Sequence, residues 1–140
     1  MNPKDFRSAY LETIYNAGGV RFQYSETNTG LVLYGGKRFT LITAANPRSQ
    51  NVSDAENAER NTQLGAAILA SGRQFEASVG SSPDGSWEEH GFLIWDAPLG
   101  EMLKLGRTYG QNAIVYGELG RVALGWCDDE LMEWFYAKAV

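Results

Sequence analysis

The sequence has a single cysteine, Cys127, and a single histidine, His90. One cysteine cannot form an intrachain disulfide, which suits a reducing compartment. One histidine and one cysteine cannot build a histidine cluster or a Cys/His zinc site. The acidic residues that follow Cys127 disfavour a thiolate nucleophile, because negative charges raise a thiol pKa. Phosphate-binding and dinucleotide-binding glycine motifs are also missing. We therefore expect no metal and no cofactor.

Basic runs and long apolar segments are missing as well. The formal net charge is −5, and an acidic chain without a Lys/Arg run argues against general nucleic-acid binding and against binding to anionic membranes. No apolar run approaches the roughly 18 residues that a membrane-spanning helix needs. Residues 1–5 do not open a signal-peptide-like segment. These features predict a cytoplasmic protein without a membrane partner.

The composition that remains is that of a folded domain. The chain has 140 residues, 44% of them hydrophobic, and 16 glycines. This length fits one domain, residues 1–140, and the glycines indicate many tight turns.

Hydrophobic periodicity divides the chain into alternating helices and strands. A first helix starts at Asn2-Pro3 and runs toward Gly18, although Thr13-Ile14-Tyr15 could instead begin a strand. A second helix is the clearest, because Ser53 and Glu56 form a capping-box pattern. The expected helices are 3–17, 53–71, 98–109 and 128–138. The expected strands are 20–24, 31–34, 38–45, 75–79, 87–95, 112–117 and 121–126.

Several of these strands follow one another through short turns, which favours antiparallel pairing. The predicted fold is therefore a single α+β domain, with a mostly antiparallel sheet and helices packed on it.

One face of the second helix carries an unusual polar group. Asn57, Arg60 and Asn61 lie at helical spacing with Leu64 and Ile68, which should pack on the sheet. The preceding loop adds Asn46, Arg48 and Ser49. Two interpretations remain open: a site for a polar or anionic small molecule near the helix N-terminus, or side chains that satisfy loop carbonyls and hold the loop in place.

Two further pairs of polar residues lie on strands. Gln111 and Asn112 enter an apolar strand, where they either bond to neighbouring backbone or face the same site. Strand alternation places Glu88 and Glu89 on opposite faces. A glutamate that is buried beside aromatic groups would have a raised pKa unless an arginine, Arg48 or Arg60, paired with it.

Several motifs resemble those of a small bacterial family known only as a domain of unknown function. These motifs are Ala9-Tyr10 with Thr13 and Tyr15, Thr43-Ala44-Ala45-Asn46-Pro47-Arg48-Ser49, Glu56-Asn57 with Arg60-Asn61 and Leu64, Glu88-Glu89 before Phe92, and Gln111-Asn112-Ala113, and the similarity spans about residues 9–126. The chain departs from the family pattern at Ala45, where a large residue is usual. The resemblance implies a compact bacterial protein and no particular activity.

Three functions are compatible with these features. The first is a binding module for a small polar or anionic ligand. The second is an enzyme, a hydrolase or transferase, that uses Glu88 or Glu89 with Arg60. The third is an acidic protein–protein interaction or inhibitor module. The candidate ligand-binding residues are Asn46, Arg48, Ser49, Asn57, Arg60, Asn61, Glu88, Glu89, Gln111 and Asn112.

Overall fold

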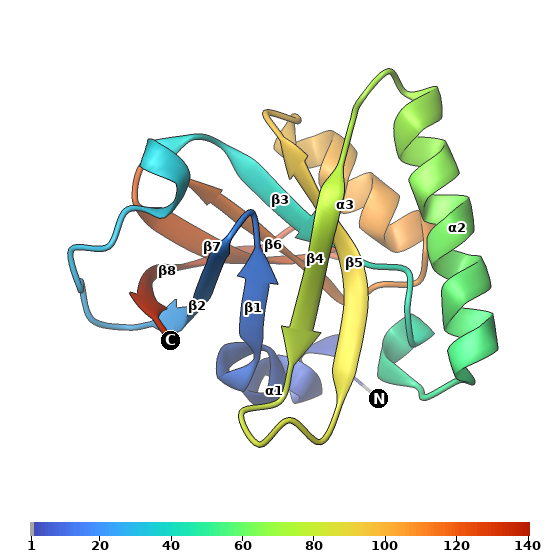
Figure 1. Cartoon of the computed structure of the whole chain (residues 1–140), viewed down its shortest axis with the longest axis horizontal. Coiled ribbons are helices and arrows are strands. Elements are labelled where there is room, and N and C mark those ends of the chain that lie inside the picture. The colour runs from blue at the N-terminus through green and yellow to red at the C-terminus, as the bar shows by residue number, and fades with distance from the viewer. Residues whose placement is uncertain (1) are drawn as a thin grey trace.

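The computed structural model describes residues 2–140, which form a closed barrel of antiparallel strands with helices on its outside (Figure 1). The strands are β1 (Ile14–Ala17), β2 (Val20–Ser25), β3 (Phe39–Ile42), β4 (Glu76–Ser81), β5 (Glu88–Trp95), β6 (Ala113–Glu118), β7 (Arg121–Trp126) and β8 (Met132–Ala139). The α-helices are α1 (Arg7–Glu12), α2 (Asp54–Ala70) and α3 (Leu99–Thr108), and the 3-10 helices are η1 (Pro3–Phe6), η2 (Leu33–Gly36) and η3 (Pro47–Ser49).

The predicted α+β fold, with helices packed on an open sheet, is wrong. Around the barrel the strands follow the order β1-β2-β8-β7-β6-β3-β5-β4, and β4 pairs again with β1. The strands that complete the circle are β1 and β8, and both lie in segments that were predicted to be helical. Without these two strands, β2 has no partner and the other five form an open sheet.

The first helix ends earlier than its apolar spacing predicts. Asn2 caps η1, α1 stops at Glu12, and Thr13 takes extended backbone angles. The chain then runs directly into β1, which pairs with β4 on one side and β2 on the other. Gly18 and Gly19 make the tight β1–β2 turn with φ of 57° and 77°, angles that glycine adopts without strain. The alternative of a strand beginning near Ile14 is therefore correct.

The predicted helix over residues 128–138 is also wrong, because this segment turns and then forms β8. Phe135 and Ala137 point into the barrel, and Glu133 shares their face. Glu133 accepts hydrogen bonds from Trp126 Nε1 at 2.8 Å and from Arg7 Nε at 2.9 Å. The charged Glu133 at an inward position interrupts the alternation of apolar and polar residues that would indicate a strand. The adjacent apolar residues Trp134 and Phe135 fit the apolar face of a helix instead.

The other elements follow the prediction more closely. Ser53 accepts a hydrogen bond from the Glu56 amide at 3.1 Å and caps α2. The β6–β7 hairpin forms at the predicted residues. The predicted strand over 31–34 is wrong, since Leu33–Gly36 forms η2, in which Tyr34 and Gly35 have positive φ.

The core has two parts that the barrel wall separates. Aromatic and aliphatic side chains such as Phe22, Phe39 and Trp126 fill the barrel interior. A second cluster, which includes Leu64, Ile68 and Met102, joins α2 and α3 to the outer wall on one side of the barrel (Figure 1). In the part of the chain from residue 2 onward, no helix is both long enough and apolar enough to cross a membrane.

Gly91 in β5 marks a point of close backbone approach. A Cβ atom there would lie 2.6 Å from the Ile42 carbonyl oxygen on the neighbouring strand β3. This oxygen cannot move without disturbing the β3–β5 pairing, so we expect Gly91→Ala to lower the free energy of unfolding by about 1–3 kcal/mol. Urea denaturation measures this change.

Gly100 in α3 provides the matched control. It is exposed, and an added Cβ there meets nothing within 4 Å. Since alanine is the better helix former, Gly100→Ala should leave the stability unchanged or slightly raised. Equal effects of the two substitutions would contradict the close packing at Gly91.

Candidate functional site

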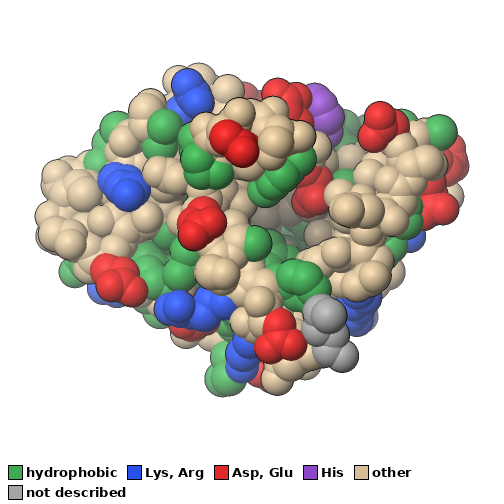
Figure 2. Space-filling view, turned by 90° about the horizontal axis from the view of Figure 1, so that it is seen from below, with side chains coloured by type: hydrophobic (Ala, Val, Ile, Leu, Met, Phe, Trp, Pro, Cys, Tyr) green, Lys and Arg blue, Asp and Glu red, His purple; other side chains and the backbone are tan. Residues whose placement is uncertain are grey.

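One end of the barrel opens into a cavity of about 440 Å³. Helix α1, the β4–β5 turn and the loop after β3 surround its mouth, and Figure 2 shows this face hollowed, with hydrophobic and acidic side chains at the rim. Its lining combines apolar and polar groups, which is the usual character of small-molecule sites. The residues that line it are Phe6, Ala9, Tyr10, Thr13, Tyr15, Leu41, Ile42, Thr43, Asn46, Ser49, Asn51, Ser78, Gly80, Trp87, Glu88, Glu89, Gly91, Gln111, Ala113, Ile114 and Val115.

Small residues in the barrel wall leave this space empty. Ser78 and Gly80 on β4 lie directly opposite Gly91 and Glu89 on β5, and Ala113 on β6 also lines the cavity. At the other end of the barrel, large aromatic side chains fill the interior. The cavity therefore follows from which residues occupy the inward positions of β4, β5 and β6.

Glu89 is the inward carboxylate of the cavity. Strand alternation places it on the inner face of β5 with Leu93, and Asn46 Nδ2 donates a hydrogen bond to its Oε2 at 3.0 Å. Burial raises the pKa of Glu89, and the hydrogen bond from Asn46 opposes this effect in part. Among residues 2–140, no donor reaches the second carboxylate oxygen, Oε1, which is thus free to accept a hydrogen bond.

Two tyrosines accompany Glu89. Burial raises the pKa of Tyr10, and the negative charge of Glu89 raises it further, so its hydroxyl stays protonated. Tyr15 lies behind it on β1 and donates a hydrogen bond to the Tyr10 carbonyl oxygen at 3.1 Å. The cavity therefore offers one inward-facing carboxylate and at least one neutral phenol.

The loop that carries Asn46 and Ser49 into the cavity has a strained backbone. Asn46, Arg48 and Ser49 have φ of 46°, 54° and 60°. Asparagine tolerates this left-handed region, but it is uncommon for arginine and serine. Such angles persist only where neighbouring contacts hold them.

The polar face of α2 supplies those contacts. Asn57 accepts a hydrogen bond from the Asn46 amide at 2.8 Å and donates one to the Asn46 side chain at 3.0 Å. Asn61 accepts one from the Ala44 amide at 2.9 Å and donates one to the His90 carbonyl at 2.9 Å. The two asparagines therefore hold the backbone of Ala44 and Asn46, directly after the end of β3, and Asn61 also links it to β5.

Arg60 completes this anchor. Its Nε donates to the Ala44 carbonyl at 2.6 Å and its Nη2 donates to the Tyr109 carbonyl at 2.7 Å. The guanidinium thus points toward the sheet end from which Asn46 emerges, as the helical spacing predicts. It links the β3 exit to the end of α3 and does not line the cavity.

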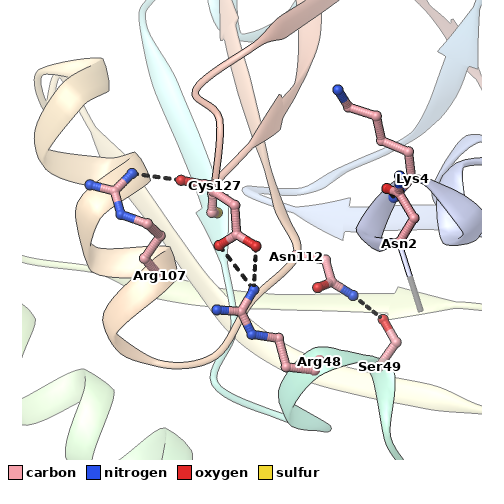
Figure 3. A network of polar contacts seen from close by, with 8 residues as sticks. Asn2, Lys4, Arg48, Ser49, Arg107, Asn112 and Cys127 are labelled. Carbon is pink, nitrogen blue, oxygen red and sulfur yellow. Dashed lines mark hydrogen bonds and ion pairs between the residues drawn. The ribbon is translucent and has the colours of Figure 1, made fainter.

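Gln111 and Asn112, which directly precede β6, hold the same loop from the other side. Gln111 lines the cavity and donates to the Ala45 carbonyl at 3.0 Å. Asn112 donates to Ser49 Oγ at 2.9 Å, as Figure 3 shows. Both side chains are buried, so each has its main partner in the loop.

The two remaining candidates, Arg48 and Glu88, have exposed side chains. Arg48 forms an ion pair with Asp128, in which Nη1 donates to both carboxylate oxygens at 3.0 Å. It borders a neighbouring hollow of about 370 Å³ together with Asn112. Glu88 is exposed on the outer face of β5, 3.9 Å from His90. Neither arginine that was considered as a partner for a buried glutamate pairs with Glu89.

The candidate residues thus separate into two groups. Those that line the cavity are Asn46, Ser49, Glu88, Glu89 and Gln111, and those outside it are Arg48, Asn57, Arg60, Asn61 and Asn112. The cavity is also lined by Tyr10, Tyr15 and Trp87, which were not among the predicted site residues. The small residues at alternating positions of β4, Ser78 and Gly80, are the signal that could have indicated an unfilled interior.

Metal and thiol chemistry have little basis in this site. Within residues 2–140, no group of three or more His, Cys, Asp or Glu side chains could hold a metal ion. Cys127 is buried, and burial together with the nearby Asp128 raises its pKa to about 12. Its thiol is therefore protonated near neutral pH.

Residues 42–114 match the family described as "Protein of unknown function (DUF3293)". This segment runs from the end of β3 to the start of β6, and includes the loop, α2 and Glu89. No curated protein and no solved structure matches the chain. The resemblance to a family of unknown function is therefore confirmed. Because the match covers more than half of the sequence, the chain belongs to the DUF3293 family.

Proposed function

We propose that this chain is a binding protein for a small molecule that has a polar head and an apolar body. The observation that carries the proposal is the cavity of about 440 Å³ at the barrel mouth. Small-molecule sites commonly measure roughly 300–1,000 Å³ and join apolar walls with a few convergent polar groups.

The polar groups converge on one side of this cavity. These groups are Glu89 on β5, Asn46 and Ser49 in the β3–α2 loop, and Gln111 directly before β6. Side-chain hydrogen bonds hold the loop against α2 and Gln111. Much of the remaining lining is apolar or aromatic, as at Leu41 and Tyr15. Such a preformed arrangement suits a ligand without a large change of the protein.

Two other roles receive less support. An enzyme that pairs a glutamate with Arg60 would need that guanidinium near the cavity, whereas both of its hydrogen bonds go to backbone carbonyls. An anionic ligand would meet Glu89 without a compensating lysine or arginine in the lining. A neutral or cationic head is the better electrostatic match.

A substitution at the mouth tests the proposal. Ala9 on α1 is exposed and lines the cavity, so tryptophan there should obstruct the entrance without altering the core. A ligand at about 100 times its Kd stabilises the folded state by about 2.7 kcal/mol. We expect a fragment screen by thermal shift to find ligands that stabilise the unmodified chain and fail to stabilise Ala9→Trp.

Ser8 is the matched control, because it is exposed on the same helix and does not line the cavity. Ser8→Trp should keep the full ligand response. If the fragments stabilise Ala9→Trp as well as Ser8→Trp, the binding site lies elsewhere and the proposal fails.

A further inference from the structure

The charges around the cavity are unbalanced. Of the residues from 2 to 140, the charged ones that line it are Glu88 and Glu89, and Glu89 is the one on the inner face. The basic residues nearby are engaged outside it: Lys4 pairs with Asp129 at 2.7 Å and Arg7 with Glu133 at 2.9 Å. The inward carboxylate of Glu89 therefore has no cationic partner among residues 2–140.

The carboxylate of Glu89 is nevertheless held in place through one of its two oxygens. Asn46 donates to Oε2, and Asn46 is itself held by Asn57. Oε1 keeps its full capacity to accept a hydrogen bond. A carboxylate in this state is partly desolvated, and it gains most from a ligand that brings both a positive charge and an N–H donor.

Aromatic side chains complete the lining. Tyr10, Tyr15, Phe6 and Trp87 surround the same space, and aromatic faces attract cations as well as apolar groups. The Tyr10 hydroxyl can accept a second hydrogen bond from an ammonium group. An ammonium attached to an aromatic or aliphatic body matches each of these features.

We propose that the barrel cavity selects a small primary amine, whose ammonium group binds Glu89 Oε1 and whose apolar body lies against the aromatic lining. This proposal rests on the proposed function, because it names the ligand class for the same cavity. The cavity volume favours a free small amine over an amine carried by a polypeptide.

Three probes of nearly equal shape test the proposal by isothermal titration calorimetry: phenethylamine, the neutral 2-phenylethanol and the anionic phenylacetate. We expect phenethylamine to bind at least about tenfold more tightly than 2-phenylethanol, and phenylacetate to bind more weakly than either. Glu89→Gln should remove the difference between the first two probes, because the amide keeps the hydrogen-bond acceptor and loses the charge. Glu59→Gln, which removes an exposed charge on α2 outside the cavity, should preserve the difference.

The outcomes separate this proposal from the previous one. Equal binding of phenethylamine and 2-phenylethanol, unchanged in Glu89→Gln, would overturn amine selection and leave the cavity as a binding site. If fragments bind the unmodified chain but not Ala9→Trp, and phenethylamine does not bind, amine selection is again overturned and the cavity remains a binding site. Binding of a short peptide with a free N-terminus, without binding of phenethylamine, would also overturn the proposal.

Discussion

Replacing Phe135 with alanine is expected to lower the free energy of unfolding by about 3–5 kcal/mol, as for other buried phenylalanines. Phe135 is 7% exposed inside the barrel. Its ring lies edge-on to Tyr24, with the centroids 5.3 Å apart. It belongs to β8, which joins β2 to β7 and so closes the barrel. Removal of the Phe135 ring therefore leaves a cavity between β8 and Tyr24 of β2.

Trp134 provides the control for this experiment. In β8 it points away from Phe135, is 39% exposed and contacts Tyr116 edge-on. Trp134→Ala should therefore cost only about 1 kcal/mol. A helix would place both residues on one face, and comparable losses for the two variants in urea denaturation would contradict the strand.

Arg60→Ala is expected to destabilise the chain by at least about 1–3 kcal/mol, the cost of leaving buried partners unsatisfied. The substitution removes the donors for two carbonyls, those of Ala44 and Tyr109. It also frees the loop whose left-handed residues, Arg48 among them, depend on their neighbours. Thermal and urea denaturation both measure this loss.

Two further variants isolate the reason. Arg60→Lys should recover only part of the stability, because one ammonium group lacks the planar fork that reaches two carbonyls. Glu59→Ala, at the exposed neighbouring position of α2, should change the stability by less than about 0.5 kcal/mol. An unchanged stability of Arg60→Ala together with loss of ligand response would instead assign Arg60 to ligand binding.

Local signals in the sequence predicted most of the elements. The Ser53–Glu56 pattern located α2, and turn residues separated the hairpin strands β6 and β7. These features depend on short-range hydrogen bonds and on side-chain periodicity, which a single sequence displays directly.

Closure of the sheet into a barrel could not be predicted from such local signals. It depends on β1 and β8, each of which has a sequence that also fits a helix. At Glu133 a charged residue faces inward because Trp126 and Arg7 bind it, and Arg7 lies 126 positions away in the sequence. Tertiary contacts thus decided between two local structures of similar propensity.

The candidate site was predicted in part for a related reason. Helical spacing correctly brought Asn57, Arg60 and Asn61 beside the loop, but it could not separate the side chains that hold the loop from those that line the cavity. Strand alternation separated Glu88 from Glu89, but it did not say which of the two faces inward. The cavity itself follows from small residues such as Ser78 and Gly80, and absent side chains leave little pattern in a sequence.

The pairing of β2 with β8 also affects how the chain is made. Phe22 lies opposite Ala139, so the barrel cannot close until β8 has been synthesised and has emerged from the ribosome. Contacts of such large sequence separation slow folding, because their loop-closure entropy is lost before they stabilise the chain. Until then, β2 and β7 each expose one unpaired edge, which is the kind of surface that chaperones protect and that drives aggregation. Synthesis of β8 removes both edges in a single step.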